Sequence, residues 1–164
     1  STPRRCSSWS PDFSSQEASP PASPGHRHLK FDILKRMRNG HYLGTARRFL
    51  DAAKRELTQG KIMQDDTALR QAAEKGWGAA LQATKGLLLR HGVKPPRGTQ
   101  RMQDRLQALE QAVAGVRKTR MYDRFTSALN DLHADAFYEG IYNLARIERH
   151  LRDLDTYIAD AARL

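Results

Sequence analysis

The sequence predicts an all-α protein that folds as an antiparallel up-and-down helical bundle. Apolar residues recur at alternating spacings of three and four over most of residues 26–164, which is the period of an amphipathic helix. No stretch shows the sustained two-residue alternation of a strand, and most glycines and prolines fall between the periodic stretches. Helices with a single apolar stripe bury it only by packing on one another, so a bundle follows.

Residues 1–25 are predicted to be a disordered tail, and residues 26–164 the bundle domain. The tail is rich in serine and holds five of the seven prolines of the chain. Such a composition cannot bury enough apolar surface to offset the entropy lost on ordering. The tail also lacks the apolar core of a secretory signal.

Two helical segments are expected first, one over residues 28–40 that ends at Gly40 and one over residues 41–59 that Gly60 closes. The second segment turns one apolar stripe inward. Its members are Leu43, Ala46, Leu50, Ala53 and Leu57.

A long helix is expected next, from a cap at Asp65 and Asp66 to about His91. Pro95 and Pro96 then force a break, because proline lacks the backbone N–H and restricts the residue before it. The predicted inward positions of the long helix are Leu69, Ala73, Trp77, Ala80, Thr84 and Leu87.

Three more helices follow the break. Thr99 is expected to cap the first, the second covers about residues 119–137, and the third begins after Gly140. Their predicted inward positions are Met102, Leu106, Leu109, Val113 and Val116, then Tyr122, Phe125, Leu129, Leu132 and Ala136, and finally Ile141, Leu144, Ile147, Leu151, Leu154, Ile158 and Ala161.

The chain is basic, with 28 lysines and arginines against 18 acidic residues, and the excess is uneven. Residues 90–124 carry nine basic and three acidic residues, whereas residues 125–164 carry four and seven. Cations beside an aromatic residue, here Tyr122, suit the phosphates and bases of RNA, although an ordinary solvated helix surface has the same composition. The candidate basic face consists of Arg97, Arg101, Arg105, Arg117, Lys118, Arg120 and Arg124.

Two stretches concentrate polar and aromatic residues: "AAEKGWGAALQATKG" at residues 72–86 and "DLHADAFYEG" at residues 131–140. Gly76 and Gly78 each cost about 1 kcal/mol inside a helix, so we expect another helix backbone to approach there. Glu74 and Lys85 lie eleven residues apart and share one edge of the apolar stripe, flanking a pocket or simply reaching solvent. His133 borders the stripe, as either a site residue or a packed histidine.

Several classes of protein are excluded. The single cysteine, Cys6, cannot form an internal disulfide and favours a reducing, cytoplasmic location. His133 with Asp131 and Asp135 lacks a second close histidine, so no metal site is predicted. Phosphate-binding loops, dinucleotide fingerprints and nucleophile elbows are absent, which predicts no cofactor and no familiar metabolic enzyme. No apolar run is long enough to span a bilayer.

The two stretches, extended to "AAEKGWGAALQATKGLLLRHG" and "LHADAFYEG", resemble the paired signatures of the PaREP-type branch of the HEPN-like superfamily. The resemblance covers residues 41–160. Asp135 stands where the family usually has asparagine, and Gly76 where it has a larger residue. The resemblance implies a bundle that is commonly dimeric, with one ligand-binding cluster. The members of this cluster would be Glu74, Trp77, Lys85, His133, Tyr138 and Glu139.

Catalytic HEPN relatives are metal-independent ribonucleases with an Arg-x4–6-His motif on a late helix. This spacing occurs here only at Arg36 and His41, ahead of the long helices. The sequence therefore assigns no catalytic residue. It favours a non-catalytic homodimer that binds RNA, a nucleotide or a protein partner, as in toxin–antitoxin or defence systems.

Two alternatives stay open. The first is a ribonuclease of divergent geometry that pairs His133 with Arg124, although that spacing is too long, or His150 with Arg146, although that spacing is too short. The second is a purely structural interaction module, in which the positive charge serves solubility.

Overall fold

A computed structural model describes the backbone from Pro24 to Leu164 and the side chains from Met37 onward. The predicted tail falls outside this range except for its last two residues, which begin the first helix. The described helices are α1 (Pro24–Met63), α2 (Asp66–Arg90), α3 (Thr99–Ala112), α4 (Ala114–Lys118), α5 (Met121–Ala128), the π-helix η1 (Leu129–Glu139) and α6 (Leu144–Arg163). Residues 24–164 contain no strand, which confirms the all-α class.

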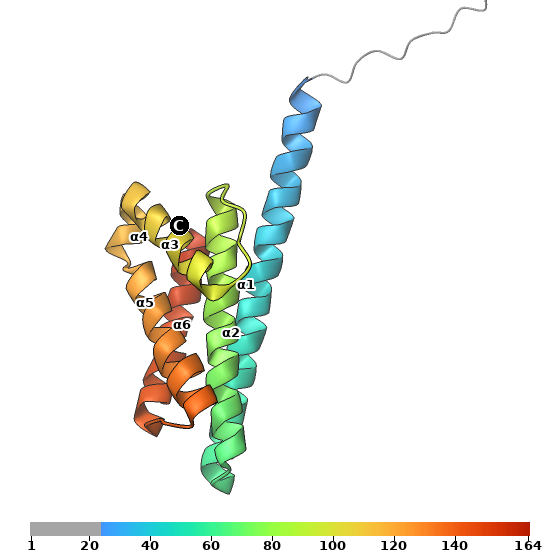
Figure 1. The fold of residues 1–164 in the computed structure, drawn as a ribbon. Coiled ribbons are helices and arrows are strands. Elements are labelled where there is room, and N and C mark those ends of the chain that lie inside the picture. The colour runs from blue at the N-terminus through green and yellow to red at the C-terminus, as the bar shows by residue number, and fades with distance from the viewer. Residues whose placement is uncertain (1–23) are drawn as a thin grey trace, which may run out of the picture.

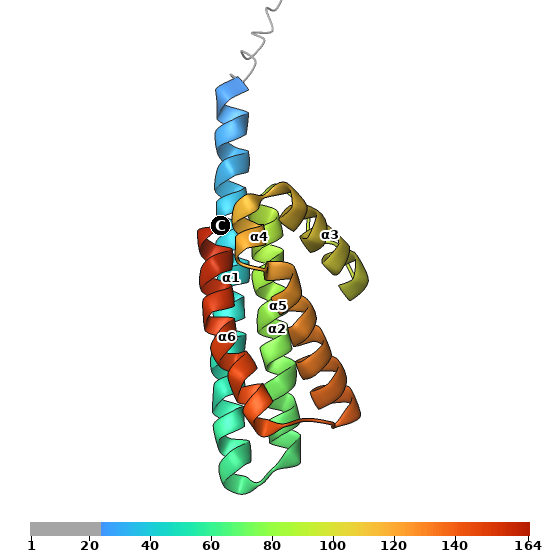
Figure 2. The ribbon, with the colours of Figure 1, turned by 90° about the vertical axis from the view of Figure 1, so that its left-hand side faces the viewer.

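The helices form a bundle whose long axis follows α1 and α2 (Figure 1). These two helices run antiparallel along one side, and α6 and the continuous α5–η1 segment lie against α2 on the other (Figure 2). The short helices α3 and α4 cover the end of the bundle where α2 finishes. The amino-terminal part of α1 extends past that end. The up-and-down arrangement predicted from the sequence is therefore confirmed.

Helix α1 is longer than predicted. The expected break at Gly40 and the expected end at Gly60 are both wrong, because α1 runs through both glycines to Met63. A glycine inside a helix costs about 1 kcal/mol but does not break it, unlike proline. Gly60 instead permits a close contact, since a Cβ there would lie 2.8 Å from Leu69 Cδ2 of α2.

The predicted cap of α2 is confirmed and that of α3 is wrong. The Asp65 carboxylate accepts hydrogen bonds from the backbone N–H groups of Thr67 at 2.9 Å and Ala68 at 3.2 Å. Thr99 is instead the first residue of α3. Gly98 precedes it with a φ of +87°, which a glycine adopts without strain, and no side chain caps this helix.

The middle of the chain is more broken than its periodicity indicates. Val113 is extended and separates α3 from α4, and Arg120 has a left-handed φ of 51° just before α5. From Leu129 the helix widens to the π form, which places one more residue in each turn. This widening changes which side chains of η1 face α2 and which face α6.

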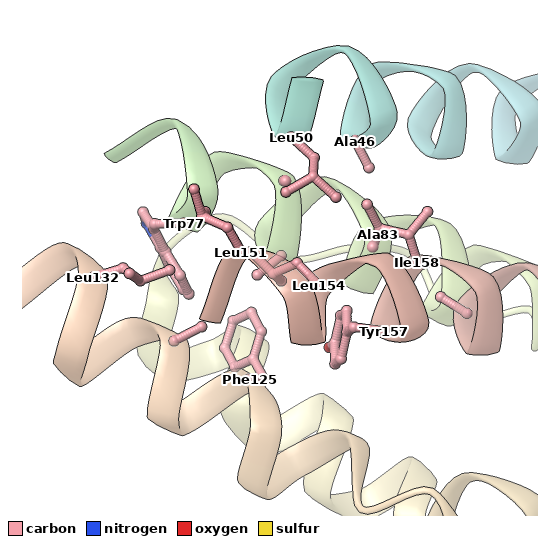
Figure 3. Packing of buried hydrophobic residues seen from close by; sticks show 14 of the residues in the cluster. Ala46, Leu50, Trp77, Ala83, Phe125, Leu132, Leu151, Leu154, Tyr157 and Ile158 are labelled. Carbon is pink, nitrogen blue, oxygen red and sulfur yellow. The ribbon is translucent and has the colours of Figure 1, made fainter. Parts of the chain in front are cut away.

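The core lies between α2, α5, η1 and α6 and is closed by α1 (Figure 3). Most predicted inward positions are buried, with the exceptions of Ile141, which is 70% exposed in the loop after η1, and several half-buried residues. Tyr157 was not predicted to be inward but is fully buried, and its hydroxyl lies 2.6 Å from Thr84 Oγ1 of α2. Burial raises the pKa of Tyr157 above its usual range. The half-buried positions are Leu43, Leu69, Val113, Tyr122, Leu129 and Leu144.

Candidate functional site

His133 of η1 and Glu74 of α2 form a carboxylate–imidazole pair. Nδ1 of His133 lies 2.7 Å from Oε2 of Glu74, and the two side chains are 23% and 33% exposed. Because an ionised carboxylate only accepts hydrogen bonds, Nδ1 donates, and Nε2 of the neutral imidazole becomes the acceptor. The structure therefore brings together two predicted site residues that are 59 positions apart.

Aromatic rings surround this pair. The imidazole of His133 lies 5.4 Å from the ring of Trp77 and 4.8 Å from that of Tyr138, measured between centroids, and Phe137 stacks at 6.4 Å. Trp77 is only 3% exposed, whereas Tyr138 is 64% exposed. The cluster thus has a buried aromatic base and an exposed aromatic edge.

Arg70 and Gly76 fix the position of η1 against α2. The Arg70 guanidinium donates to the carbonyl oxygens of Phe137, at 3.0 Å from Nε, and of Tyr138, so it satisfies the last turn of η1. At Gly76 a Cβ would lie 2.6 Å from Leu151 Cδ2 and 3.1 Å from Leu132 Cδ1. The expectation of a second helix backbone at this glycine is wrong, because side chains of α6 and η1 fill the space.

Two members of the predicted cluster lie apart from it. Lys85 is eleven residues beyond Glu74 on α2, which places it about 16 Å further along the helix axis. No hydrogen bond or ion pair joins Lys85 or the exposed Glu139 to the other four within residues 37–164. The geometric cluster is therefore Glu74, Trp77, His133 and Tyr138, with Phe137 added.

Most of the predicted basic face is exposed. Arg97, Arg101, Arg105, Arg117 and Lys118 are exposed on or beside α3 and α4, and none forms an ion pair with a described side chain. Arg120 is exposed and pairs with Asp123 at 2.9 Å. The five cations without an ion pair therefore remain available to an anionic partner.

Arg124 differs from the rest of the basic face because it is used inside the protein. Its guanidinium bonds Asp160 at 2.8 Å, Thr156 Oγ1 at 2.8 Å and the Asp153 carbonyl oxygen at 3.1 Å, and it lies 5.1 Å from the ring centroid of Tyr157. Arg124 thus fastens α5 to α6 and is only 26% exposed.

We expect acid to weaken this attachment through Asp160. Burial disfavours its ionised form, but hydrogen bonds from Arg124 and Arg163 outweigh burial and lower its pKa. A lowered pKa in the folded state gives stability that is complete above the ordinary pKa and is lost as the pH falls through the folded value. The melting temperature of Asp160→Asn should therefore approach that of the wild type as the pH falls from 7 to below about 4. A difference that stays constant with pH would contradict this account.

A second carboxylate–imidazole pair joins η1 to α6 and was not predicted as a pair. His150 Nε2 lies 2.6 Å from Asp131 Oδ2, and Arg146 Nη1 lies 3.3 Å from Asp131 Oδ1. The Asp131 side chain is 22% exposed. The only sequence signal was the four-residue spacing of Arg146 and His150, which places both on one face of α6.

A cavity of about 240 Å³ opens beside this second pair, between α5 and α6. We call it the α5–α6 cavity. His150, which is 9% exposed, forms part of its wall. The lining residues are Arg124, Ser127, Ala128, His150, Asp153, Leu154, Thr156 and Tyr157.

Two kinds of feature were not found among the described residues. Residues 24–164 include no helix long and apolar enough to cross a membrane. Among residues 37–164, whose side chains are described, no three histidine, cysteine, aspartate or glutamate residues are grouped as a metal ion would require.

These features define an all-α bundle protein in which a π-helix carries two carboxylate–imidazole pairs, one to each neighbouring helix. The chain belongs to the archaeal PaREP1/PaREP8 family, whose family model matches residues 43–158. The match contains both signature stretches and both pairs. No curated protein and no solved structure matches the chain significantly.

Proposed function

We propose that this chain is a non-catalytic, HEPN-like bundle that binds RNA through its basic face. The observation that carries the proposal is the set of five exposed cations on and beside α3 and α4 that have no carboxylate partner among the described side chains. Cations that are not neutralised within the protein release counterions from a bound phosphate backbone, which drives association. Helices α3 and α4 lie next to each other at the end of the bundle where α2 finishes (Figure 2), so we expect their cations to present one surface there.

Self-association into a homodimer, as expected from the HEPN-like resemblance, is part of the proposal. A group of exposed apolar side chains supports self-association, because large apolar patches are uncommon on the surface of a monomer. Four of them lie on the segments at the α1–α2 turn and the η1–α6 loop: Ile62, Met63, Tyr138 and Ile141. The hydrogen bond between Tyr142 and Asp66 brings the two segments next to each other. The proposed role is that of an RNA-binding component of a toxin–antitoxin or defence system.

The test is binding of labelled single-stranded RNA in EDTA over a salt series. In the test variant, glutamine replaces three arginines of the basic face: Arg97, Arg101 and Arg105. The slope of the logarithm of the association constant against the logarithm of the salt concentration should become less negative by about 2, and the affinity at low salt should fall by about 10- to 100-fold. Sedimentation equilibrium of the same preparation gives the oligomeric state.

The matched control replaces three exposed arginines outside the basic face with glutamine: Arg47 of α1 with Arg149 and Arg152 of α6. The two triple variants lose the same net charge. If RNA contacts the basic face itself, the control variant should therefore bind RNA with nearly the affinity of the wild type. An equal loss in both triple variants would show that only overall charge attracts the RNA, and would contradict a defined basic face.

A metal-independent ribonuclease is a second candidate, favoured by the way Asp131 joins Arg146 to His150. The engagement of Arg124 with Asp160 and Thr156 speaks against its use with His133. Cleavage of the RNA in EDTA that disappears in His150→Ala would replace the binding proposal with this one. Neither retention nor cleavage would favour a purely structural interaction module.

A further inference from the structure

We infer that the α5–α6 cavity receives a ribose of the RNA held by the basic face and reads its 2′-hydroxyl through His150. This inference rests on the proposed function, because the basic face supplies the RNA. It adds a second site, in which a hydroxyl group rather than a phosphate is recognised.

The hydrogen bond from His150 to Asp131 determines which ring nitrogen of His150 carries the proton. Its Nε2 lies 2.6 Å from the Asp131 carboxylate, so Nε2 donates, and in the neutral tautomer that this bond selects Nδ1 carries the lone pair. Nδ1 has no hydrogen-bond partner among the described residues and is not sealed from solvent. A side chain that is 9% exposed and lines a cavity thus keeps one acceptor open.

Two hydroxyl groups of the cavity wall also donate their hydrogen bonds to other groups of the protein. Ser127 Oγ donates to Asp131 Oδ2 at 3.2 Å. Thr156 Oγ1 donates to the Asp153 carbonyl oxygen at 2.8 Å and accepts from Arg124 Nη2 at 2.8 Å, which leaves it one lone pair. With His150 Nδ1, the wall therefore offers lone pairs. Such a wall selects a ligand that brings its own hydrogen-bond donors, and a hydroxyl group is the uncharged donor that fits.

The position of the cavity identifies the hydroxyl-bearing ligand. Arg124 of α5 lines it, and Arg120 lies one turn earlier at the start of the same helix, so the cavity adjoins the basic face. A ligand that is both polyanionic and rich in hydroxyls is RNA, whose 2′-hydroxyl distinguishes it from DNA. The cavity has room for about one sugar and excludes a duplex.

The experiment compares RNA, DNA and 2′-O-methyl RNA of one sequence in EDTA. Wild-type protein should bind RNA about 3- to 10-fold more tightly than the other two, which is the effect of one hydrogen bond. His150→Gln places an amide nitrogen where Nε2 was, so it retains the bond to Asp131 but lacks Nδ1. This variant should bind all three strands equally, with the DNA affinity of the wild type.

His41→Gln is the matched control, because His41 is exposed on α1 and does not line the α5–α6 cavity; it should keep the preference for RNA. Equal binding of RNA and DNA by the wild type overturns the inference and leaves the proposed function standing. An undiminished preference in folded His150→Gln also overturns it. Failure to bind either nucleic acid overturns the proposed function itself. Should His150→Gln fail to fold, the 2′-O-methyl comparison on the wild type still decides.

Discussion

Replacing Trp77 with alanine is expected to lower the free energy of unfolding by about 3–5 kcal/mol. The indole is 3% exposed and packs between α5 and η1, with ring centroids 5.0 Å from Phe125 and 5.4 Å from His133. Removing it leaves a cavity where three helices meet, and the surrounding backbone collapses only partly. A domain of this size is stable by only about 5–15 kcal/mol, so the variant should be close to unfolding.

Guanidinium unfolding followed by far-ultraviolet circular dichroism measures this effect without depending on tryptophan fluorescence. Phe49→Ala serves as the control, because Phe49 is 36% exposed on α1 and its removal should cost no more than about 1 kcal/mol. A loss of less than 1 kcal/mol for Trp77→Ala would mean that the indole does not fill the core.

Replacing Gly76 with leucine is expected to destabilise the protein by about 3 kcal/mol, near the upper end of overpacking effects. A Cβ at this position would already lie 2.6 Å from Leu151 Cδ2 and 3.1 Å from Leu132 Cδ1, and both leucines are buried, so they have little room to shift. The larger side chain would separate α2 from η1 and α6. It would therefore also displace His133 from Glu74.

Gly78→Ala, two residues away, is the matched comparison. Its Cβ would lie 3.3 Å from Phe49 Cδ1, and this partly exposed ring has room to shift. Alanine is favoured over glycine in a helix by about 1 kcal/mol, so this variant should be neutral or slightly stabilised. Thermal melts of the two variants decide the matter: equal melting temperatures would contradict the close packing at Gly76.

The elements whose prediction succeeded are those fixed by local rules. Nearly all the positions that the apolar period predicts to be inward in α2 and α6 are at least half-buried, although both helices bury further residues that it did not include. The Asp65 cap follows from a side chain and a backbone a few residues apart. The signature residues around Glu74 and His133 can also be recognised from the sequence alone, because they lie within two short stretches.

The elements that were missed depend on neighbours far along the chain. Helix α1 continues through Gly40 and Gly60, since packing against α2 outweighs the local cost of glycine. Lys85 shares a helix edge with Glu74, but a helix rises about 1.5 Å per residue, so a common edge does not make a common site.

The sequence by itself determined that this protein is an all-α bundle with an exposed basic surface, because periodicity, caps and charge act locally. Only the tertiary structure decided which polar residues meet. His133 of η1 bonds Glu74 of α2, Asp131 of η1 bonds His150 of α6, and Arg124 forms bonds with α6. These pairs form because buried polar groups need hydrogen-bond partners, and the packing of the helices decides which groups come close together. The residue spacing within a single segment does not predict that packing.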